Sequence, residues 1–151
     1  VSLAREIVPK LAISTDVMVG FPGETDPQFQ QTMKAFEEIR FDQAFMFKYS
    51  DRPGTRSEKM PDKVRATVKQ ERLARLVALQ NRVGREINVS QVGQEFEVLV
   101  ESVDAKSPDK LRGRTRQNKL MIFPSTDESL IGQRVTVRAT EGYLWGYVGE
   151  L

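Results

Sequence analysis

The sequence predicts two structural modules, an α/β segment over residues 1–87 and a small all-β barrel over residues 88–151. In the first module, a short apolar run, an amphipathic stretch and a second apolar run form a strand–helix–strand pattern. A long charged helical segment follows. From Asn88 onward the sequence instead contains five short runs separated by turn residues, which is typical of a small barrel of the oligonucleotide-binding kind.

The first module begins with a short helical segment over residues 2–11, which Pro9 ends. Residues 13–19 are rich in β-branched side chains and are followed by the sequence GFPGE, as expected for a buried parallel strand that ends in a tight turn. Thr25 and Gln28 then supply a capping box for a helix. A second apolar run, residues 41–50, predicts a strand covered on both faces, so these elements form a right-handed βαβ unit.

The remaining elements are one long helix and the barrel strands. Residues 61–86 carry apolar side chains at helical spacing between many charges, which predicts a helix that ends the first module and connects it to the second. Strands are expected at residues 95–101, 111–116, 120–123, 133–140 and 144–151, with turns at 107–109, 124–127 and 141–142.

Positive charge is concentrated in the stretch 110–124, which has five cations in its first ten residues and then turns apolar. As a strand it places Arg112, Arg114 and Arg116 on one face, about 6.6 Å apart, because side chains alternate with a period of two. The small residues between them suit the inside of a curved barrel wall, so the arginines point to water or to a partner. Arginine grips phosphate and stacks on bases, which makes this face a candidate polyanion site; a solvated face without a ligand is the alternative.

Two further groups of residues are candidates for binding. The loops at residues 20–24 and 49–55 follow the carboxyl ends of the predicted parallel strands, where ligands gather in such folds, although both could be ordinary turns. Tyr143, Trp145 and Tyr147 alternate on the last predicted strand. They could stack on bases or serve as core or barrel-rim residues.

The composition excludes several classes of protein. The chain has no cysteine and no histidine, so it carries no disulfide framework, none of the usual zinc or haem ligands and no common nucleophile–base pair. Its net charge of +2 is small, and a nucleic-acid site would therefore be a local patch. No apolar run is long enough to span a membrane and no signal peptide opens the sequence, so a cytoplasmic protein is expected.

Five motifs occur in an order and spacing typical of one family: STDVMVGFPGET, FDQAFMFKYSDRPGT, ERLARLVALQ, EFEVLVE and GRTRQNKLMIFP. In these motifs the chain resembles the radical S-adenosylmethionine tRNA methylthiotransferases, specifically their carboxyl-terminal part. Residues 88–151 resemble the family's TRAM domain, a small OB-like RNA-binding barrel. The resemblance implies that residues 1–87 are the last βα elements of the radical S-adenosylmethionine partial barrel plus a connecting helix.

The resemblance implies an enzyme that methylthiolates a modified adenosine next to the tRNA anticodon, using S-adenosylmethionine and two 4Fe-4S clusters. Because this chain has no cysteine, the cluster ligands are absent from it. We therefore expect this chain to be a fragment that is inactive alone but supplies tRNA binding and part of the cofactor and substrate site. Its expected partners are the tRNA anticodon stem-loop and the missing amino-terminal part of the same polypeptide. If expressed alone, roughly the first 85 residues should expose a sheet edge and self-associate.

The resemblance also assigns roles to individual residues, none of them catalytic or metal-binding. The expected cofactor contacts are Gly20, Gly23 and Glu24; the expected substrate contacts are Tyr49, Ser50 and Arg52; the expected RNA contacts are Lys110, Arg112, Arg114, Arg116, Asn118 and Lys119.

Two alternatives remain at the level of sequence. One is the relative that methylthiolates an aspartate of a ribosomal protein, although the Arg-Pro-Gly-Thr at residues 52–55 favours the tRNA branch. The other is a complete, non-enzymatic RNA-binding module. Two lone parallel strands and a first residue other than methionine argue against that reading.

Overall fold

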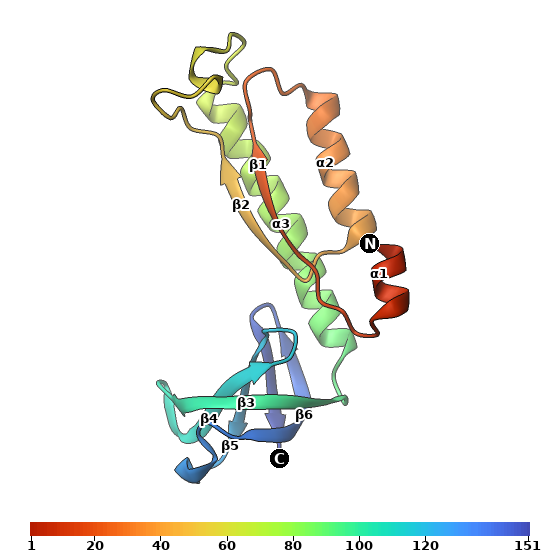
Figure 1. Ribbon diagram of the computed structural model, residues 1–151, viewed down its shortest axis with the longest axis vertical. Coiled ribbons are helices and arrows are strands. Elements are labelled where there is room, and N and C mark those ends of the chain that lie inside the picture. Colours follow the sequence, from red (N-terminus) through yellow and green to blue (C-terminus); the bar gives the residue numbers. More distant parts are fainter. The chain divides into compact units, whose positions relative to one another are not determined.

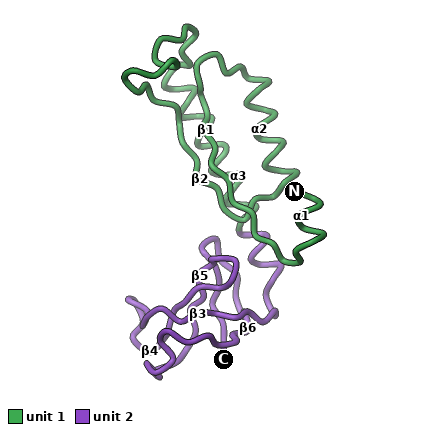
Figure 2. The backbone as a smooth tube through the Cα atoms, in the orientation of Figure 1, with its two compact units in different colours: residues 1–84 green, residues 85–151 purple.

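The computed structural model describes residues 1–151 and consists of two compact units, residues 1–84 and residues 85–151 (Figure 2). The division lies within the long helix, between residues 84 and 85. No helix combines the length and the apolar character needed to cross a bilayer.

Unit 1 contains a strand–helix–strand unit followed by a long helix (Figure 1). Its elements are α1 (Ser2–Ile7), β1 (Ser14–Val19), α2 (Asp26–Ile39), β2 (Gln43–Lys48), the 3-10 helix η1 (Ser57–Lys59) and α3 (Ala66–Ser90), whose last turns belong to unit 2. The two strands pair in parallel, with Ser14 opposite Gln43 and Val19 opposite Lys48. The predicted βαβ unit is therefore present, while α3 begins and ends later than the predicted 61–86 helix.

The start of α2 confirms the predicted capping box. Thr25 Oγ1 accepts a hydrogen bond from the Gln28 backbone N–H, and Gln28 Oε1 accepts one of 2.8 Å from the Thr25 backbone N–H. Two backbone donors that a helix start leaves unpaired are thereby satisfied. The helix turns its buried Phe29 and Phe36 toward the core, where Phe36 meets Phe41 edge to face at 5.0 Å.

The two-stranded sheet is covered on one face only, and the prediction that the second strand is covered on both faces is wrong. Val17, Val19 and Met46 lie on the less exposed face, whereas Phe45 and Phe47 on the other face are 52% and 51% exposed. The difference arises because α3 packs on one side of the strands: Gln80 donates to the Phe41 carbonyl and Lys69 to the Tyr49 carbonyl. A continuous apolar run does not reveal which of its faces the same chain covers.

Unit 2 is a closed five-stranded barrel, as the sequence predicted. The strands are β3 (Glu95–Asp104), β4 (Ser107–Thr115), β5 (Leu120–Pro124), β6 (Arg134–Tyr143) and β7 (Gly146–Glu150), with the 3-10 helix η2 (Glu128–Leu130) before β6. They close in the order β3-β4-β5-β7-β6, in which only β5 and β7 are parallel. The interior is filled by Phe96, Val98, Val100, Leu111, Met121, Phe123, Val137, Ala139 and Tyr147.

Two predicted turns are wrong. The β3–β4 turn lies at residues 105–106, before the predicted 107–109, because the Asp104 carboxylate accepts 3.0 Å hydrogen bonds from the backbone N–H groups of Lys106 and Ser107 and so closes the turn early. The β6–β7 turn lies at residues 144–145, after the predicted 141–142. Gly146 then takes φ +145°, and a Cβ there would lie 2.0 Å from the Leu120 carbonyl oxygen, so only glycine fits.

Candidate functional site

The basic face predicted from the sequence is formed by β4. Lys110, Arg112 and Arg114 point outward and alternate with the buried side chains of β4. Gly113 lies so close to β3 that a Cβ would meet the Leu99 carbonyl oxygen at 2.1 Å, which fixes the register that turns the arginines outward. Arg116 departs from the prediction, since β4 ends at Thr115 and Arg116 lies in the following turn.

The arginines on this face lie beside carboxylates of β3. Arg116 Nε is 2.9 Å from Glu97 Oε1, and Arg114 Nε is 3.8 Å from Glu101 Oε2. Arg112 is less exposed and donates a 3.1 Å hydrogen bond from Nε to Ser102 Oγ. Exposed ion pairs of this kind contribute only about 0–1 kcal/mol, so a phosphate group can replace the carboxylate at little cost.

Two cations of β6, which sequence reasoning missed, extend the basic face. Arg134 NH1 lies 3.9 Å from Glu97 Oε1, and Arg138 NH2 lies 3.2 Å from Glu95 Oε1. The antiparallel pairing of β3 with β6 brings them there, with Leu99 opposite Arg134. Their spacing on a predicted strand was visible in the sequence. Their position beside β3 was not, because strand pairing is non-local.

Asn118 and Lys119, both predicted RNA contacts, have structural roles. Asn118 takes φ 58° in the β4–β5 turn, and its carbonyl accepts a 3.2 Å hydrogen bond from Arg114 NH1. Lys119 Nζ donates a 2.7 Å hydrogen bond to Asn88 Oδ1 and lies 6.0 Å from the centre of the Tyr147 ring. Lys119 thus connects β5 to the last turn of α3.

The three aromatic residues near the carboxyl terminus have different positions. Tyr147 is fully buried in the barrel, stacks on Phe96 at 4.9 Å and hydrogen-bonds through its hydroxyl to Asn88 and Gln91. Tyr143 and Trp145 lie at the β6–β7 turn with their rings 5.1 Å apart and nearly parallel, and Trp145 is 45% exposed. The Tyr143 hydroxyl donates to Glu141, which raises the pKa of Tyr143 above its ordinary value. This aromatic pair is the part of the predicted set that is accessible to solvent.

The loops of unit 1 enclose a hollow of about 520 Å³ at the carboxyl ends of β1 and β2. It brings together the three predicted substrate residues, Tyr49, Ser50 and Arg52, with Phe21, whose ring meets that of Tyr49 edge to face at 5.2 Å. Arg52 is exposed and its guanidinium makes no hydrogen bond or ion pair within the chain. A guanidinium in this state is available to a phosphate or a carboxylate.

Asp51 holds the second loop of this hollow in place. Its carboxylate accepts hydrogen bonds from the Lys63 ammonium and, at 2.9 Å, from the Tyr49 hydroxyl. The bond from Lys63, followed by the bond from Tyr49, lowers the pKa of Asp51 below its ordinary value, and Asp51 in turn raises the pKa of Lys63. Lys63 also donates to the Ser57 carbonyl, so the loop is closed by side chains.

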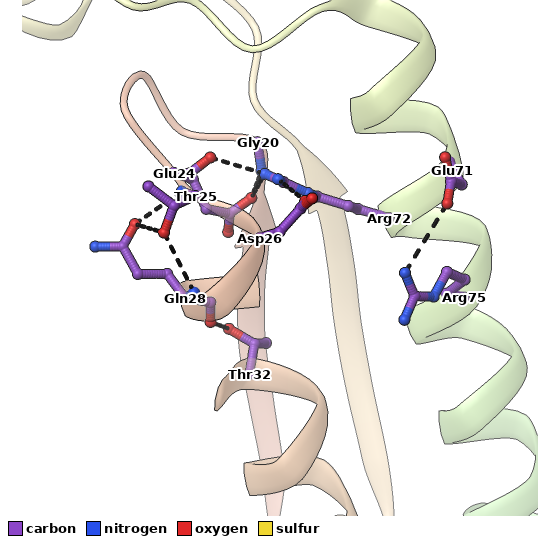
Figure 3. Close-up of polar contacts among 9 residues, drawn as sticks. All are labelled: Gly20, Glu24, Thr25, Asp26, Gln28, Thr32, Glu71, Arg72 and Arg75. Carbon is purple, nitrogen blue, oxygen red and sulfur yellow. Dashed lines mark hydrogen bonds and ion pairs between the residues drawn. The ribbon is translucent and has the colours of Figure 1, made fainter. Parts of the chain in front are cut away.

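The three predicted cofactor residues are in the loop after β1, and their roles differ; Figure 3 shows two of them, Gly20 and Glu24. Gly20 and Gly23 take φ +73° and +84°, which glycine adopts without strain, and Gly23 is exposed. The Glu24 side chain turns inward: Oε2 accepts hydrogen bonds of 2.7 Å from both the Gly20 N–H and Arg72 NH1. Sequence reasoning missed Arg72, which lies on α3.

Arg72 is buried, with 6% of its side chain exposed, and also donates from NH2 to Asp26. Burial alone would lower the pKa of Arg72, but the hydrogen bonds to Asp26 and Glu24 outweigh it and raise that pKa. The Glu24 carboxylate is therefore occupied in shaping the loop, while the Phe21 side chain of the same loop is exposed.

The barrel of unit 2 is similar to a known domain family. Residues 83–148 match the TRAM domain family. The matched residues include nearly all of the closed barrel of unit 2.

The chain as a whole is similar to proteins named tRNA-2-methylthio-N(6)-dimethylallyladenosine synthase. It is 47% identical over 147 residues to the one from Symbiobacterium thermophilum, 46% to that from Moorella thermoacetica and 48% to that from Bacillus mycoides. Each match covers 97% of this chain but 31%, 33% and 29% of the relative, respectively. The chain therefore spans about a third of the length of these relatives. The resemblance to the tRNA methylthiotransferases drawn from the sequence is confirmed.

Proposed function

We propose that this chain is the carboxyl-terminal part of an enzyme that methylthiolates a modified adenosine next to the tRNA anticodon, and that unit 2 binds the tRNA. The names of the relatives and the TRAM match support the proposal. A tRNA substrate is favoured over a ribosomal protein because the relatives are named as tRNA-modifying enzymes. The match of unit 1 as well as unit 2 to these relatives argues against an independent RNA-binding module.

The observation that carries the proposal is the cluster of arginine side chains on the outward face of β4 and on the segments near it. Guanidinium groups lie on β4, on the turn that follows it and on β6, where β4 and β6 flank β3 on its two sides. Their carboxylate partners on β3 hold them only weakly. Such a surface contacts the sugar–phosphate backbone and positions the RNA largely without reading sequence. The anticodon stem-loop is the part of the tRNA that must lie nearby if the modified adenosine is the substrate.

Unit 1 would supply part of the cofactor and substrate site as the last βα elements of a radical S-adenosylmethionine barrel. The hollow at the ends of β1 and β2 fits part of such a site: aromatic side chains line it, and the guanidinium of Arg52 is available for a carboxylate or a phosphate. S-adenosylmethionine supplies the radical and the methyl group when bound. Gly20 and Gly23 would present their backbone to S-adenosylmethionine. Arg72 would act only indirectly, because it holds Glu24 and thereby fixes the shape of the loop after β1.

The 4Fe-4S clusters of this family do not fit the residues present. The chain has no cysteine, and no group of three potential ligand side chains lies together. The cluster ligands would belong to the amino-terminal part of the same polypeptide, which would also cover the exposed Phe45 and Phe47 of β2. We therefore expect no methylthiotransferase activity from this chain alone.

The proposal is tested by binding of a labelled tRNA anticodon stem-loop at two salt concentrations, with fluorescence anisotropy as the readout. The parent chain should bind, and a tenfold rise in salt should weaken binding steeply because phosphate contacts release counterions. The variant with Arg112, Arg114 and Arg116 all changed to alanine should lose most of the affinity.

A matched control removes the same charge elsewhere and changes Lys34, Lys59 and Arg82 to alanine. These are exposed cations of unit 1. This control should bind nearly as the parent does. Equal losses in both variants would show that total charge and not the β4 face governs binding, and a parent chain that does not bind would overturn the proposal.

A further inference from the structure

A hollow of about 230 Å³ lies on the outer wall of the barrel, at the centre of the arginine-rich face. It is lined by Glu97, Leu99, Arg114, Thr115, Arg116 and Arg134, which come from β3, β4, the turn after β4 and β6. Of these residues, only Arg114 and Arg116 were predicted to contact RNA. The lining mixes an apolar side chain, a carboxylate and three guanidinium groups, which a site for phosphate alone would not need.

Leu99 forms the apolar part of the hollow. It lies on the outer face of β3 between Glu97 and Glu101 and is 45% exposed, while Val98 and Val100 beside it are buried. A flat aromatic group laid over Leu99 would remove this apolar surface from water and would lie within reach of guanidinium planes on both sides. Nucleobases are recognised in this way when they are unstacked from the RNA.

The carboxylate of Glu97 is the group that would distinguish one base from another. Its Oε1 accepts a hydrogen bond of 2.9 Å from Arg116 Nε and lies 3.9 Å from Arg134 NH1, whereas its Oε2 accepts no hydrogen bond. An ionised carboxylate only accepts hydrogen bonds. Guanine presents two donors side by side on its pairing edge, the ring N–H and the exocyclic amine, and so matches a carboxylate. Uracil presents one N–H between two carbonyl oxygens, which a carboxylate repels.

The arginines complete a nucleotide site. Arg116 uses Nε toward Glu97 and keeps its two terminal nitrogens for other acceptors, and the Arg134 side chain is 69% exposed. Guanidinium groups that flank a base pocket can bind the adjoining phosphates through charge-assisted hydrogen bonds.

We propose that this hollow binds a single unpaired guanosine of the RNA, with the base over Leu99, its pairing edge on Glu97 and the adjoining phosphates on Arg116 and Arg134. The inference rests on the proposed RNA-binding function of the barrel and adds to it a base preference located at Glu97.

The test compares labelled heptamers of uridine that carry guanosine, inosine or uridine at the central position. Inosine lacks only the exocyclic amine, so it separates one donor from two. The full 151-residue chain should bind the guanosine heptamer about fivefold or more tightly than the uridine heptamer, the lower end of what a bidentate base contact contributes, with inosine between them. Anisotropy at one fixed salt concentration gives all three affinities.

The decisive variant is Glu97→Gln, and its matched control is Glu95→Gln. Both remove one carboxylate from β3, so both should raise affinity for the uridine heptamer, but Glu95 pairs with Arg138 outside the hollow. Glu97→Gln should abolish the guanosine preference and Glu95→Gln should keep it.

Equal binding of guanosine and uridine by the parent, or a preference that survives Glu97→Gln, would overturn this inference and leave the proposed function standing. Failure of the parent to bind the tRNA stem-loop as well as every heptamer would instead overturn the proposed function.

Discussion

Arg72 of α3 donates two hydrogen bonds from a single guanidinium nitrogen to Glu24, one to the carboxylate at 2.7 Å and one to the backbone carbonyl at 3.0 Å. Through the same carboxylate oxygen, Glu24 accepts the Gly20 N–H. One buried side chain of the long helix thus fixes both ends of the loop that follows β1 (Figure 3). The shape of the candidate cofactor loop therefore depends on a residue 48 positions away in the sequence.

Arg72→Ala should destabilise unit 1 by about 3–5 kcal/mol, because removing one partner of a buried ion pair leaves the other charge uncompensated. Thermal or urea unfolding measures the loss, and hydrogen exchange should show faster exchange of the Gly20 amide. Arg82→Ala is the matched control, since its pair with Glu37 is 3.8 Å long and exposed. A loss no larger than that of the control would contradict the role assigned to Arg72.

Gly113→Ala should disrupt the β3–β4 pairing, since the added Cβ would lie 2.1 Å from the Leu99 carbonyl oxygen and 2.8 Å from a Val98 methyl group. The backbone cannot move away without breaking the hydrogen bonds between β3 and β4. Overpacking of this kind lowers the free energy of unfolding by about 1–3 kcal/mol or more. Chemical unfolding of the barrel, followed by circular dichroism, gives the change. Arg114→Ala, next in sequence but exposed, should leave barrel stability within about 0.5 kcal/mol. Similar stabilities for the two variants would be inconsistent with the close approach at Gly113.

The sequence predicted the parts of the fold that depend on local periodicity and missed the parts that depend on distant partners. Alternation with a period of two correctly placed Arg112 and Arg114 outside the barrel. Arg116 was misplaced because the strand stops one residue earlier, where the Asn118 N–H bonds to the Thr115 carbonyl and closes a turn. A turn that depends on positive φ at an asparagine is weakly marked in sequence.

The candidate sites show the same contrast between features that depend on local sequence and features that depend on distant partners. The loop after β1 stood out by its glycines, and the family resemblance made Glu24 an expected cofactor contact. Nothing in the local sequence indicates that Arg72 is the partner of Glu24. Likewise, the position of Arg134 opposite Leu99 depends on the register of β3 with β6, which one sequence does not specify. Residue types and spacing therefore indicated two candidate regions, and long-range pairing decided which of their side chains make contacts within the chain.

The loop that carries Arg52 should respond to pH through Asp51. Because Lys63 and Tyr49 lower its pKa in the folded state, Asp51 contributes stability that is fully present above its ordinary pKa of 3.8 and is lost as the pH falls through the lower, folded value. Carboxyl NMR titration should place the Asp51 midpoint below 3.8, and Lys63→Gln should move it back toward that value. A midpoint at or above 3.8 in the parent would show that the loop is not held by this contact.

Trp145 is the only tryptophan of the chain, so its fluorescence reports directly on the exposed aromatic pair at the β6–β7 turn. If RNA bases stack on this pair, the stem-loop should quench and shift the emission, and Trp145→Ala should weaken binding by about 1–3 kcal/mol, the usual contribution of one stacked base. Tyr147→Phe is the contrasting change, because its ring is buried and its hydroxyl bonds to Asn88 and Gln91. It should lower barrel stability by about 1 kcal/mol, as expected for loss of a buried hydrogen bond, and leave RNA affinity nearly unchanged where the barrel is folded. Unchanged tryptophan emission at saturating RNA, with full affinity in Trp145→Ala, would remove this turn from the RNA surface and confine binding to the arginine-rich face.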